Sequence, residues 1–211
     1  MVEIKALSLI IKRNCVLDGI SLTASKGQIT GFVGPNGSGK TITMKCMAGF
    51  ITTYTGSISI NGINTKDIKV PGMGILIETP GFISYYSGFR NLKILAGLSG
   101  IRDDKMIKDI MTEVGLDPRS SKPVSKYSLG MKQRLGIAQA FMEDKDIIIL
   151  DEPFNGLDSE ISEVLRKRIL KEKDLGKTII ISSHNKQDID TLCDMVHLFE
   201  CGRIAGVQTR E

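Results

Sequence analysis

The feature that most constrains this chain is a glycine-rich stretch with a single lysine near its end. It reads Gly34-Pro35-Asn36-Gly37-Ser38-Gly39-Lys40-Thr41. A short β-branched run at 28–33 precedes it, and the segment 41–49 can continue as a helix. Glycines let the backbone turn sharply, so that successive N–H groups face one anion, and the helix adds the positive end of its dipole. This stretch fits the pattern of a phosphate loop, which is Gly, any four residues, and then Gly-Lys-Ser/Thr, placed between a strand and a helix. The pattern predicts that the chain binds a nucleoside triphosphate.

Two side chains of this loop have their own expected roles. We expect the ammonium group of Lys40 to reach the β- and γ-phosphates. The Thr41 hydroxyl is expected to coordinate Mg²⁺. The remaining loop residues are expected to bind phosphate through the backbone: Gly34, Pro35, Asn36, Gly37, Ser38 and Gly39.

A second site is predicted where an apolar run ends in two carboxylates. Ile147-Ile148-Ile149-Leu150 is followed by Asp151-Glu152-Pro153. A buried strand of this kind places charge at the carboxyl edge of a sheet, where ligands bind in open α/β folds. We expect Asp151 to hold Mg²⁺ and Glu152 to polarise the attacking water.

Composition narrows the class of protein. The 211 residues suffice for one large domain or a domain with an inserted lobe, and the net charge of +4 is spread without a Lys/Arg block, so no nucleic-acid partner is expected. The four cysteines form no CxxC pair and no metal-like spacing with the histidines, which favours a reduced, cytosolic setting. The N-terminus lacks the apolar core of a signal peptide, and no run is long enough to cross a bilayer.

The order of strands and helices predicts an α/β fold. Apolar strands bounded by helices indicate a P-loop NTPase core with a mainly parallel sheet, preceded by an N-terminal antiparallel β-subdomain. Strands are expected at 3–9, 16–22, 28–33, 55–62, 73–77, 147–150 and 178–182, with a terminal pair turning at Gly202. Helices are expected at 41–49, 88–98, 103–114, 129–143, 159–173 and 186–192. The run of helices interrupts the alternation, so we predict one domain, 1–211, with a core at about 1–80 and 144–211 and an inserted α-helical lobe at about 81–143.

Five motifs, in this order and spacing, resemble the ATP-binding subunits of ABC transporters. They are residues 34–41, 127–134 (Tyr-Ser-Leu-Gly-Met-Lys-Gln-Arg), 147–153, 155–158 (Asn-Gly-Leu-Asp) and 183–184 (Ser-His). The resemblance covers nearly the whole chain. It implies an ATPase that binds ATP and Mg²⁺, pairs with a second copy of itself or a homologous subunit, and powers a separate membrane permease.

The resemblance also implies roles for four residues. Ser128 and Gly130 match the signature motif, which contacts the γ-phosphate bound to the other protomer; a serine N-cap and a helix N-terminus suit an anion. Asp158 matches the carboxylate that communicates across the dimer. His184 matches the histidine that contacts the γ-phosphate.

The chain departs from the family pattern at several positions. Leu129 and Met131 replace the first glycine and the glutamine of the signature. Glu78 replaces the glutamine expected after strand 73–77; its oxygen can approach Mg²⁺ or the catalytic water, but it lacks amide donors. Ile10 and Ile11 stand where the family usually places an aromatic residue that stacks on adenine, which predicts weak selection between ATP and GTP.

Two other functions fit parts of the sequence. Asn185-Lys186-Gln187-Asp188 follows an apolar strand, like the guanine-reading motif of GTPases, but Glu152-Pro153-Phe154 stands where a GTPase has its Asp-x-x-Gly turn. A non-transport ABC ATPase of translation or repair is the other alternative, although such proteins usually carry long insertions or a second cassette.

The aromatic segment 80–89 adds an expectation about the permease. In the family this region borders the groove that receives a short helix of the membrane subunit, and aromatic side chains suit such a contact. The alternative is that these side chains seal the lobe onto the core; we favour the docking role. The resemblance therefore places the protein in the cytoplasm, on the inner face of the membrane through its permease. Residues 78–82 and 127–134 are similar to the antibiotic and lantibiotic export or immunity branch.

Overall fold

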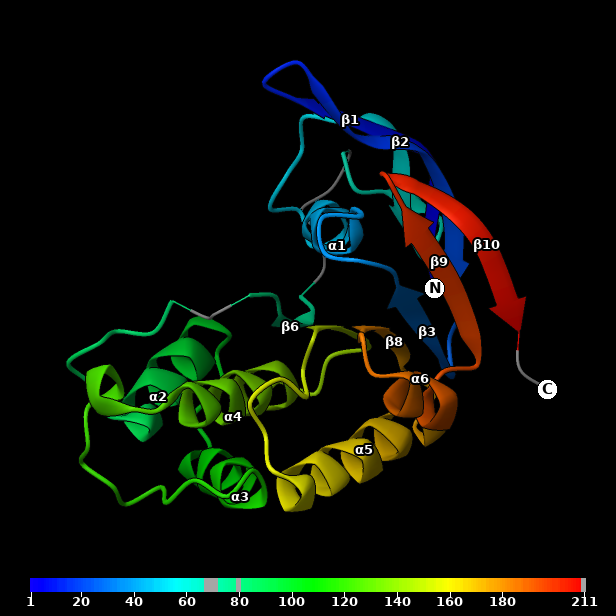
Figure 1. The fold of residues 1–211 in the computed structure, drawn as a ribbon. Helices are drawn as coiled ribbons and strands as arrows, with labels where there is room; N and C mark the ends of the chain where they lie inside the picture. Colours follow the sequence, from blue (N-terminus) through cyan, green and yellow to red (C-terminus); the bar gives the residue numbers. More distant parts are fainter. Residues whose placement is uncertain (67–71, 79–80, 210–211) are drawn as a thin grey trace.

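A six-stranded sheet runs through the middle of the molecule (Figure 1). The computed structural model describes residues 1–66, 72–78 and 81–209. The order of the strands is β10-β9-β3-β8-β7-β6, and every neighbouring pair is parallel except β9 with β10. The strands are β3 (Gln28–Val33), β6 (Gly74–Leu76), β7 (Ile147–Asp151), β8 (Thr178–Ser182), β9 (Met195–Glu200) and β10 (Arg203–Thr209). The predicted mainly parallel core sheet is confirmed.

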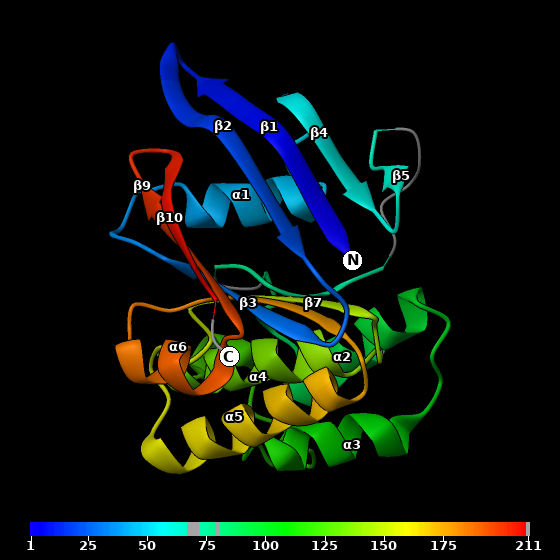
Figure 2. The same cartoon turned by 90° about the vertical axis from the view of Figure 1, so that its right-hand side faces the viewer.

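A second, antiparallel sheet is built from the N-terminal strands, in the order β2-β1-β4-β5. Its strands are β1 (Val2–Ile11), β2 (Asn14–Ala24), β4 (Thr55–Ile60) and β5 (Ile63–Asn64). Helix α1 (Lys40–Met47) lies between this sheet and the six-stranded one (Figure 2). The N-terminal antiparallel subdomain predicted from the sequence is therefore present.

The apolar strands of the large sheet contribute to two hydrophobic cores, because successive side chains point to opposite faces. Ile149 and Ile180 pack toward α1 and the antiparallel sheet. Ile148 and Ile179 pack toward the helices on the other face. Both faces are covered, which explains why these strands are continuously apolar rather than alternating.

The remaining helices cover the second face of the large sheet and extend beyond its end. They are α2 (Gly88–Leu98), α3 (Asp104–Glu113), α4 (Leu129–Phe141), α5 (Ser159–Asp174) and α6 (Lys186–Leu192). Helices α2, α3 and α4 lie together as a lobe at one end of the molecule (Figure 1). The predicted lobe, 81–143, encloses these three helices, and its boundaries stay a prediction. Residues 67–71, 79–80 and 210–211 of the predicted core lie outside the described residues.

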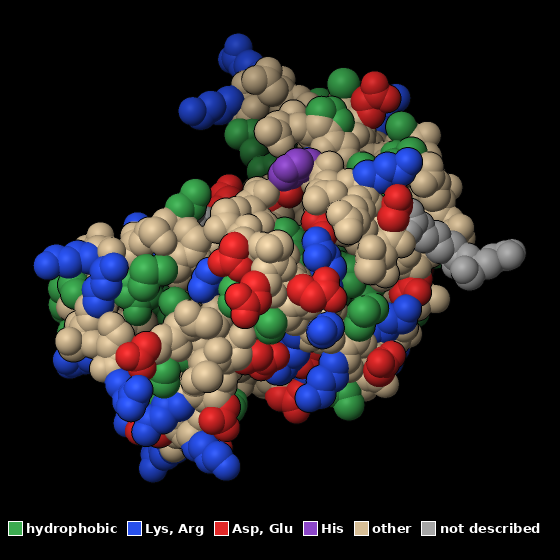
Figure 3. All heavy atoms as spheres, turned by 60° about the horizontal axis from the view of Figure 1, so that its bottom comes forward, with side chains coloured by type: hydrophobic (Ala, Val, Ile, Leu, Met, Phe, Trp, Pro, Cys, Tyr) green, Lys and Arg blue, Asp and Glu red, His purple; other side chains and the backbone are tan. Residues whose placement is uncertain are grey.

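Ion pairs tie the lobe to the core. Acidic and basic side chains are interspersed on the face formed by the helices (Figure 3). Arg168 of α5 bonds Glu113 of α3 at 2.8 Å and Glu172 of its own helix at 2.6 Å. Glu172 is buried and also pairs with Lys177 at 2.5 Å, so its charge is compensated from two sides.

Candidate nucleotide site

The phosphate loop joins β3 to α1, and residues far along the chain hold its backbone. A Cβ atom on Gly34 would lie 2.1 Å from the carbonyl oxygen of Phe199 in β9, so only glycine fits there. Gly202, in the turn between β9 and β10, donates its N–H to the carbonyl oxygen of Ser38 at 3.0 Å. Gly39 has φ +109°, a conformation that other residues rarely adopt. The strand–loop–helix context predicted for this stretch is present.

A cavity of about 210 Å³ opens at this loop. Besides Val16 and Ile42, it is lined by residues that the sequence analysis assigned to the site: Asn36, Gly37, Gly39, Lys40, Thr41, Asp151 and Glu152. Strands β3 and β7 both border β8 in parallel and so end at the same edge of the sheet. The fold thereby brings the phosphate loop and the carboxylate pair together.

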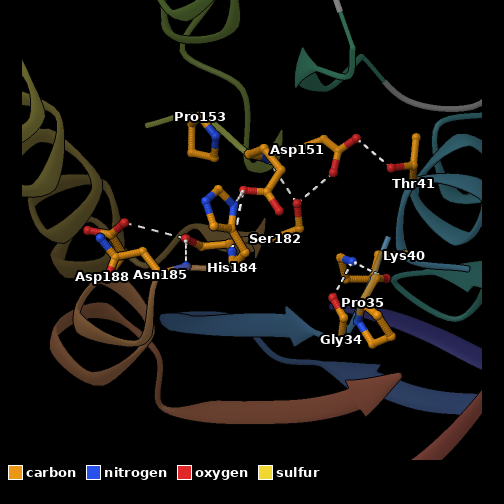
Figure 4. Close-up of polar contacts among 12 residues, drawn as sticks. Gly34, Pro35, Lys40, Thr41, Asp151, Pro153, Ser182, His184, Asn185 and Asp188 are labelled. Carbon is orange, nitrogen blue, oxygen red and sulfur yellow. Dashed lines mark hydrogen bonds and ion pairs between the residues drawn. The ribbon is translucent and has the colours of Figure 1, made fainter. Parts of the chain in front are cut away.

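The Lys40 side chain is buried and folds back over the loop. Its Nζ donates to the carbonyl oxygens of Gly34 at 2.7 Å and Pro35 at 3.0 Å (Figure 4). The buried Ser38 hydroxyl has no hydrogen-bond partner among the described residues. Among the described residues, this buried ammonium is held by carbonyl dipoles alone. Both it and the buried unpaired hydroxyl suit an anionic ligand in this loop.

Three oxygen-bearing side chains meet at the predicted Mg²⁺ site. Thr41 Oγ1 donates to Asp151 Oδ2 at 2.7 Å, and Ser182 Oγ donates to Asp151 Oδ1 at 2.5 Å (Figure 4). One hydroxyl and one carboxylate, completed by phosphate oxygens and water, form the donor set that Mg²⁺ usually takes in nucleotide sites. The described residues contain no group of three or more His, Cys, Asp and Glu that could hold a metal alone. The residues therefore fit a Mg²⁺ ion that arrives with a nucleotide.

Glu152 and His184 form a hydrogen-bonded contact beside the cavity. His184 Nδ1 lies 2.8 Å from Glu152 Oε2, and the backbone N–H of His184 donates to the same oxygen at 3.4 Å. Glu152 lines the cavity, and its side chain is 22% exposed, whereas that of His184 is 68% exposed. A carboxylate so held can accept a proton from a water molecule in the cavity.

Ser128, Gly130 and Asp158 lie outside this cavity. Ser128 and Asp158 directly precede α4 and α5, and Gly130 lies in the first turn of α4. Ser128 Oγ caps α4 by accepting the N–H of Met131 at 3.2 Å. Asp158 Oδ1 caps α5 by accepting the N–H of Ile161 at 2.9 Å, and this bond, with help from the Arg134 charge, lowers the pKa of the Asp158 carboxyl. A Cβ atom on Gly130 would lie 2.6 Å from the carbonyl oxygen of Gly156, so the signature and the 155–158 motif are in direct contact.

The structure does not bring Glu78 to the predicted metal site. Its carboxylate pairs with Lys45 of α1 at 2.6 Å, and its side chain is 61% exposed. The backbone of Glu78 is in the left-handed region, with φ +56°. Glu78 is not among the residues that line the nucleotide cavity. A role at Mg²⁺ stays a prediction that requires release of the Lys45 pair.

The position predicted to face the base carries no aromatic side chain. Ile10 and Ile11 are 68% and 39% exposed at the end of β1. Val16 of β2, which the sequence analysis did not single out, lines the nucleotide cavity. Ile10, Ile11 and Val16 therefore offer the base of a nucleotide aliphatic side chains and no aromatic ring.

The GTPase-like motif at residues 185–188 makes contacts within the fold. Asn185 Oδ1 accepts the N–H of Gln187 at 2.9 Å and caps α6. Asp188 is buried and pairs with Arg166 at 2.7 Å. Both side chains that would read guanine are therefore engaged within the fold, and nothing supports this alternative.

Sequence reasoning missed two residues that contact the predicted catalytic pair. Ser182 accepts the backbone N–H of Glu152 at 2.9 Å, in addition to its bond with Asp151. The sequence could have indicated Ser182, because it ends the apolar strand β8 as Asp151 ends the apolar strand β7. The two strands are adjacent and parallel, and these two residues are partners in the register. Gln133, in α4, bonds the backbone of Glu152 and Pro153, and no local pattern indicates this contact.

These features define a phosphate-loop nucleotide-binding protein with a helical lobe. The family model described as ABC transporter matches residues 17–155, and the chain belongs to this family. It is an ATP-binding ATPase of the kind that serves ABC transporters. The described helices include none that is long and apolar enough to span a membrane.

Relatives and solved structures agree with this assignment. The uncharacterized ABC transporter ATP-binding protein YybJ of Bacillus subtilis is 45% identical over 206 residues, covering 97% of this chain and 94% of that protein. The lantibiotic transport ATP-binding protein SrtF of Streptococcus pyogenes is 33% identical, covering 97% and 89% of the two chains. A solved structure of an ATP binding subunit of an ABC transporter superposes with a TM-score of 0.91 at 28% identity, covering 99% and 90%.

Proposed function

We propose that this protein hydrolyses MgATP as one half of a dimer and thereby drives a separate membrane permease that exports an antimicrobial peptide. The observation that carries the proposal is the convergence of Lys40, the Thr41–Asp151 pair and the Glu152–His184 pair around one cavity. Each of the three groups suits a different part of the reaction.

The loop and Lys40 bind the phosphates, and Thr41 with Asp151 holds the Mg²⁺ ion, which offsets phosphate charge when bound. Glu152 takes the proton of the attacking water. His184 fixes the orientation of the Glu152 carboxylate through their 2.8 Å contact and is exposed enough to reach a γ-phosphate. Glu78 joins the site only after its ion pair with Lys45 opens.

The dimer part of the proposal rests on the helix start at Ser128. A capped helix N-terminus is an anion site, yet Ser128 and Gly130 lie outside the cavity of their own chain. In a dimer they complete the nucleotide site of the partner subunit, with Asp158 beside them. A dimeric ABC transporter cassette, MJ0796, shares the fold with a TM-score of 0.88 at 21% identity.

A groove of about 390 Å³ between β6, α2 and α4 supports a permease contact. Its lining is mainly apolar and includes Phe50, which is 63% exposed, with Ile77, Phe82 and Ile94. Of the aromatic segment predicted to form this surface, Phe82 lines the groove, whereas Arg90 covers the ring of Tyr86 at 3.8 Å. Through such a contact the subunit would bind at the cytoplasmic face of the membrane.

The choice of an antimicrobial peptide as cargo rests on relatives. SrtF is named for lantibiotic transport, and the BcrA protein of Enterococcus faecalis, 40% identical over 196 residues (90% of this chain, 63% of that protein), is named for bacitracin transport.

Two substitutions separate binding from hydrolysis. Lys40→Ala removes the phosphate-binding ammonium and should abolish ATP binding in calorimetry while the melting temperature stays unchanged. Glu152→Gln leaves the loop and the Mg²⁺ ligands intact, so it should bind MgATP while hydrolysis falls on the order of 10²–10⁴-fold. A Glu152→Gln protein that hydrolyses ATP at the parent rate would overturn the catalytic assignment.

A further inference from the structure

Glu152 has a backbone conformation that its sequence does not favour. Its φ is +47°, in the left-handed region, although glutamate carries a Cβ. Such a conformation is unfavourable for a residue with a Cβ and persists only where the surroundings impose it. The contacts that hold Glu152 in this conformation therefore help to set the direction of its carboxylate.

Three side chains hold Glu152 at three different groups. Ser182 accepts its N–H at 2.9 Å, and His184 contacts its carboxylate at 2.8 Å. Gln133 Nε2 donates to its carbonyl oxygen at 3.1 Å and to that of Pro153 at 3.0 Å. An amide nitrogen carries two hydrogens, so a single Gln133 side chain can serve both carbonyls.

Gln133 differs from the other two in its origin. Ser182 is the last residue of β8 and His184 follows this strand, both in the core, whereas Gln133 belongs to α4, the lobe helix that Ser128 caps. The only other bond to the Glu152 carbonyl among the described residues is the local turn bond from the N–H of Asn155 at 3.2 Å. Gln133 thus links the position of α4 to the backbone conformation of Glu152.

We propose that Gln133 is a positioning residue for hydrolysis, which fixes the backbone turn at Glu152–Pro153 and so aims the Glu152 carboxylate at the attacking water. The inference rests on the proposed role of Glu152 as the group that accepts the water's proton. Helix α4 would then have a second role besides offering its N-terminus to an anion. While Gln133 of α4 bonds the turn after β7, the Glu152 carboxylate points at the water, and a shift of α4 that breaks these bonds removes that orientation.

The test compares two substitutions of the same residue. Gln133→Met keeps the length of the side chain and removes both donors; kcat for ATP should fall about 10- to 100-fold, the scale of a misplaced catalytic group, while KM changes less than about 2-fold. Gln133→Lys keeps a donor at this position. On a logarithmic scale, its kcat should lie at least halfway from that of Gln133→Met to that of the parent protein. Lys167→Met, at an exposed position of α5, controls for a surface methionine and should leave kcat unchanged.

A double mutant separates positioning from general damage. In the Glu152→Gln background, Gln133→Met should change the residual single-turnover rate less than about 2-fold, since the group it aligns is already disabled. An equal fall in both backgrounds, or a parental kcat for Gln133→Met alone, overturns the inference while the function of Glu152 stands. A parental rate for Glu152→Gln alone overturns the proposed function, and the inference with it.

Discussion

His197 of β9 is a buried histidine whose two ring nitrogens have no hydrogen-bond partner in the part of the chain that the structure describes. The ring of Phe32 lies edge-on at 6.2 Å, so the surroundings are apolar. Burial lowers the pKa of His197 below its ordinary value of 6.5, because the imidazolium would lose its hydration. The neutral ring is therefore the form that the fold accepts.

This residue predicts a pH dependence of stability. Below pH 6.5 the unfolded chain binds a proton on His197 that the folded protein does not bind, so the free energy of unfolding should fall as the pH drops. One such proton gives a slope of up to about 1.4 kcal/mol per pH unit. Urea unfolding at pH 7.5, 6.5 and 5.5 measures it. His197→Leu, of similar volume, should lose this slope, whereas equal slopes in both proteins would contradict the assignment.

At the level of single residues, the sequence predicted those that belong to a motif. Lys40, Thr41, Asp151 and Glu152 meet as expected, because a phosphate loop and an acidic strand end have fixed places on a parallel sheet. The pairing of Glu78 with Lys45 was not predictable, since it joins residues 33 positions apart that share no motif.

At the level of elements, two helices offer a matched pair of N-caps. Asp103 caps α3 by accepting the N–H groups of Lys105 and Met106, and Asp158 caps α5. Replacing Asp103 with alanine should lower the free energy of unfolding by about 1 kcal/mol, the usual value of a cap, and replacing Asp158 should lower it as well. The exposed pair between Asp158 and Arg134 should add little.

Activity distinguishes these two caps. Asp103 lies in the lobe away from the nucleotide cavity, so Asp103→Ala should keep the ATPase rate, whereas Asp158→Ala should lower it if Asp158 lies at the dimer interface. Chemical denaturation and a steady-state ATPase assay on both variants provide the comparison. Equal activity of the two variants would argue against a role of Asp158 across the dimer.

Elements were predicted more completely than contacts. Polar caps mark the starts of helices, as at Ser87, Asp103 and Ser128, and apolar runs mark the buried strands. The contacts between elements, such as Gln133 of α4 with the turn after β7, depend on packing over a distance that local patterns do not record.

At the level of the whole molecule, the proposed dimer gives the last prediction. In Glu152→Gln, unhydrolysed ATP should hold the phosphate loop of one subunit against Ser128 and Gly130 of the partner subunit. Light scattering should therefore report a shift from monomer to dimer when MgATP is added. Adding Ser128→Arg should reverse the shift, because the larger side chain blocks the site and removes the cap.

The control for this experiment is Lys40→Ala, which should stay monomeric with MgATP because it cannot bind the nucleotide. A Glu152→Gln protein that stays monomeric at saturating MgATP, both alone and with its permease in detergent, would contradict the two-subunit site.

The bond between Gly202 and Ser38 has a consequence for protein synthesis. The ribosome makes the phosphate loop early, but β9 and the turn that braces it only some 160 residues later. A nascent chain that has emerged as far as β8 contains every residue of the loop, yet neither Phe199 nor Gly202 is present to fix its shape. The contacts that hold the loop in shape are thus completed only after β9 and the turn that follows it have been made.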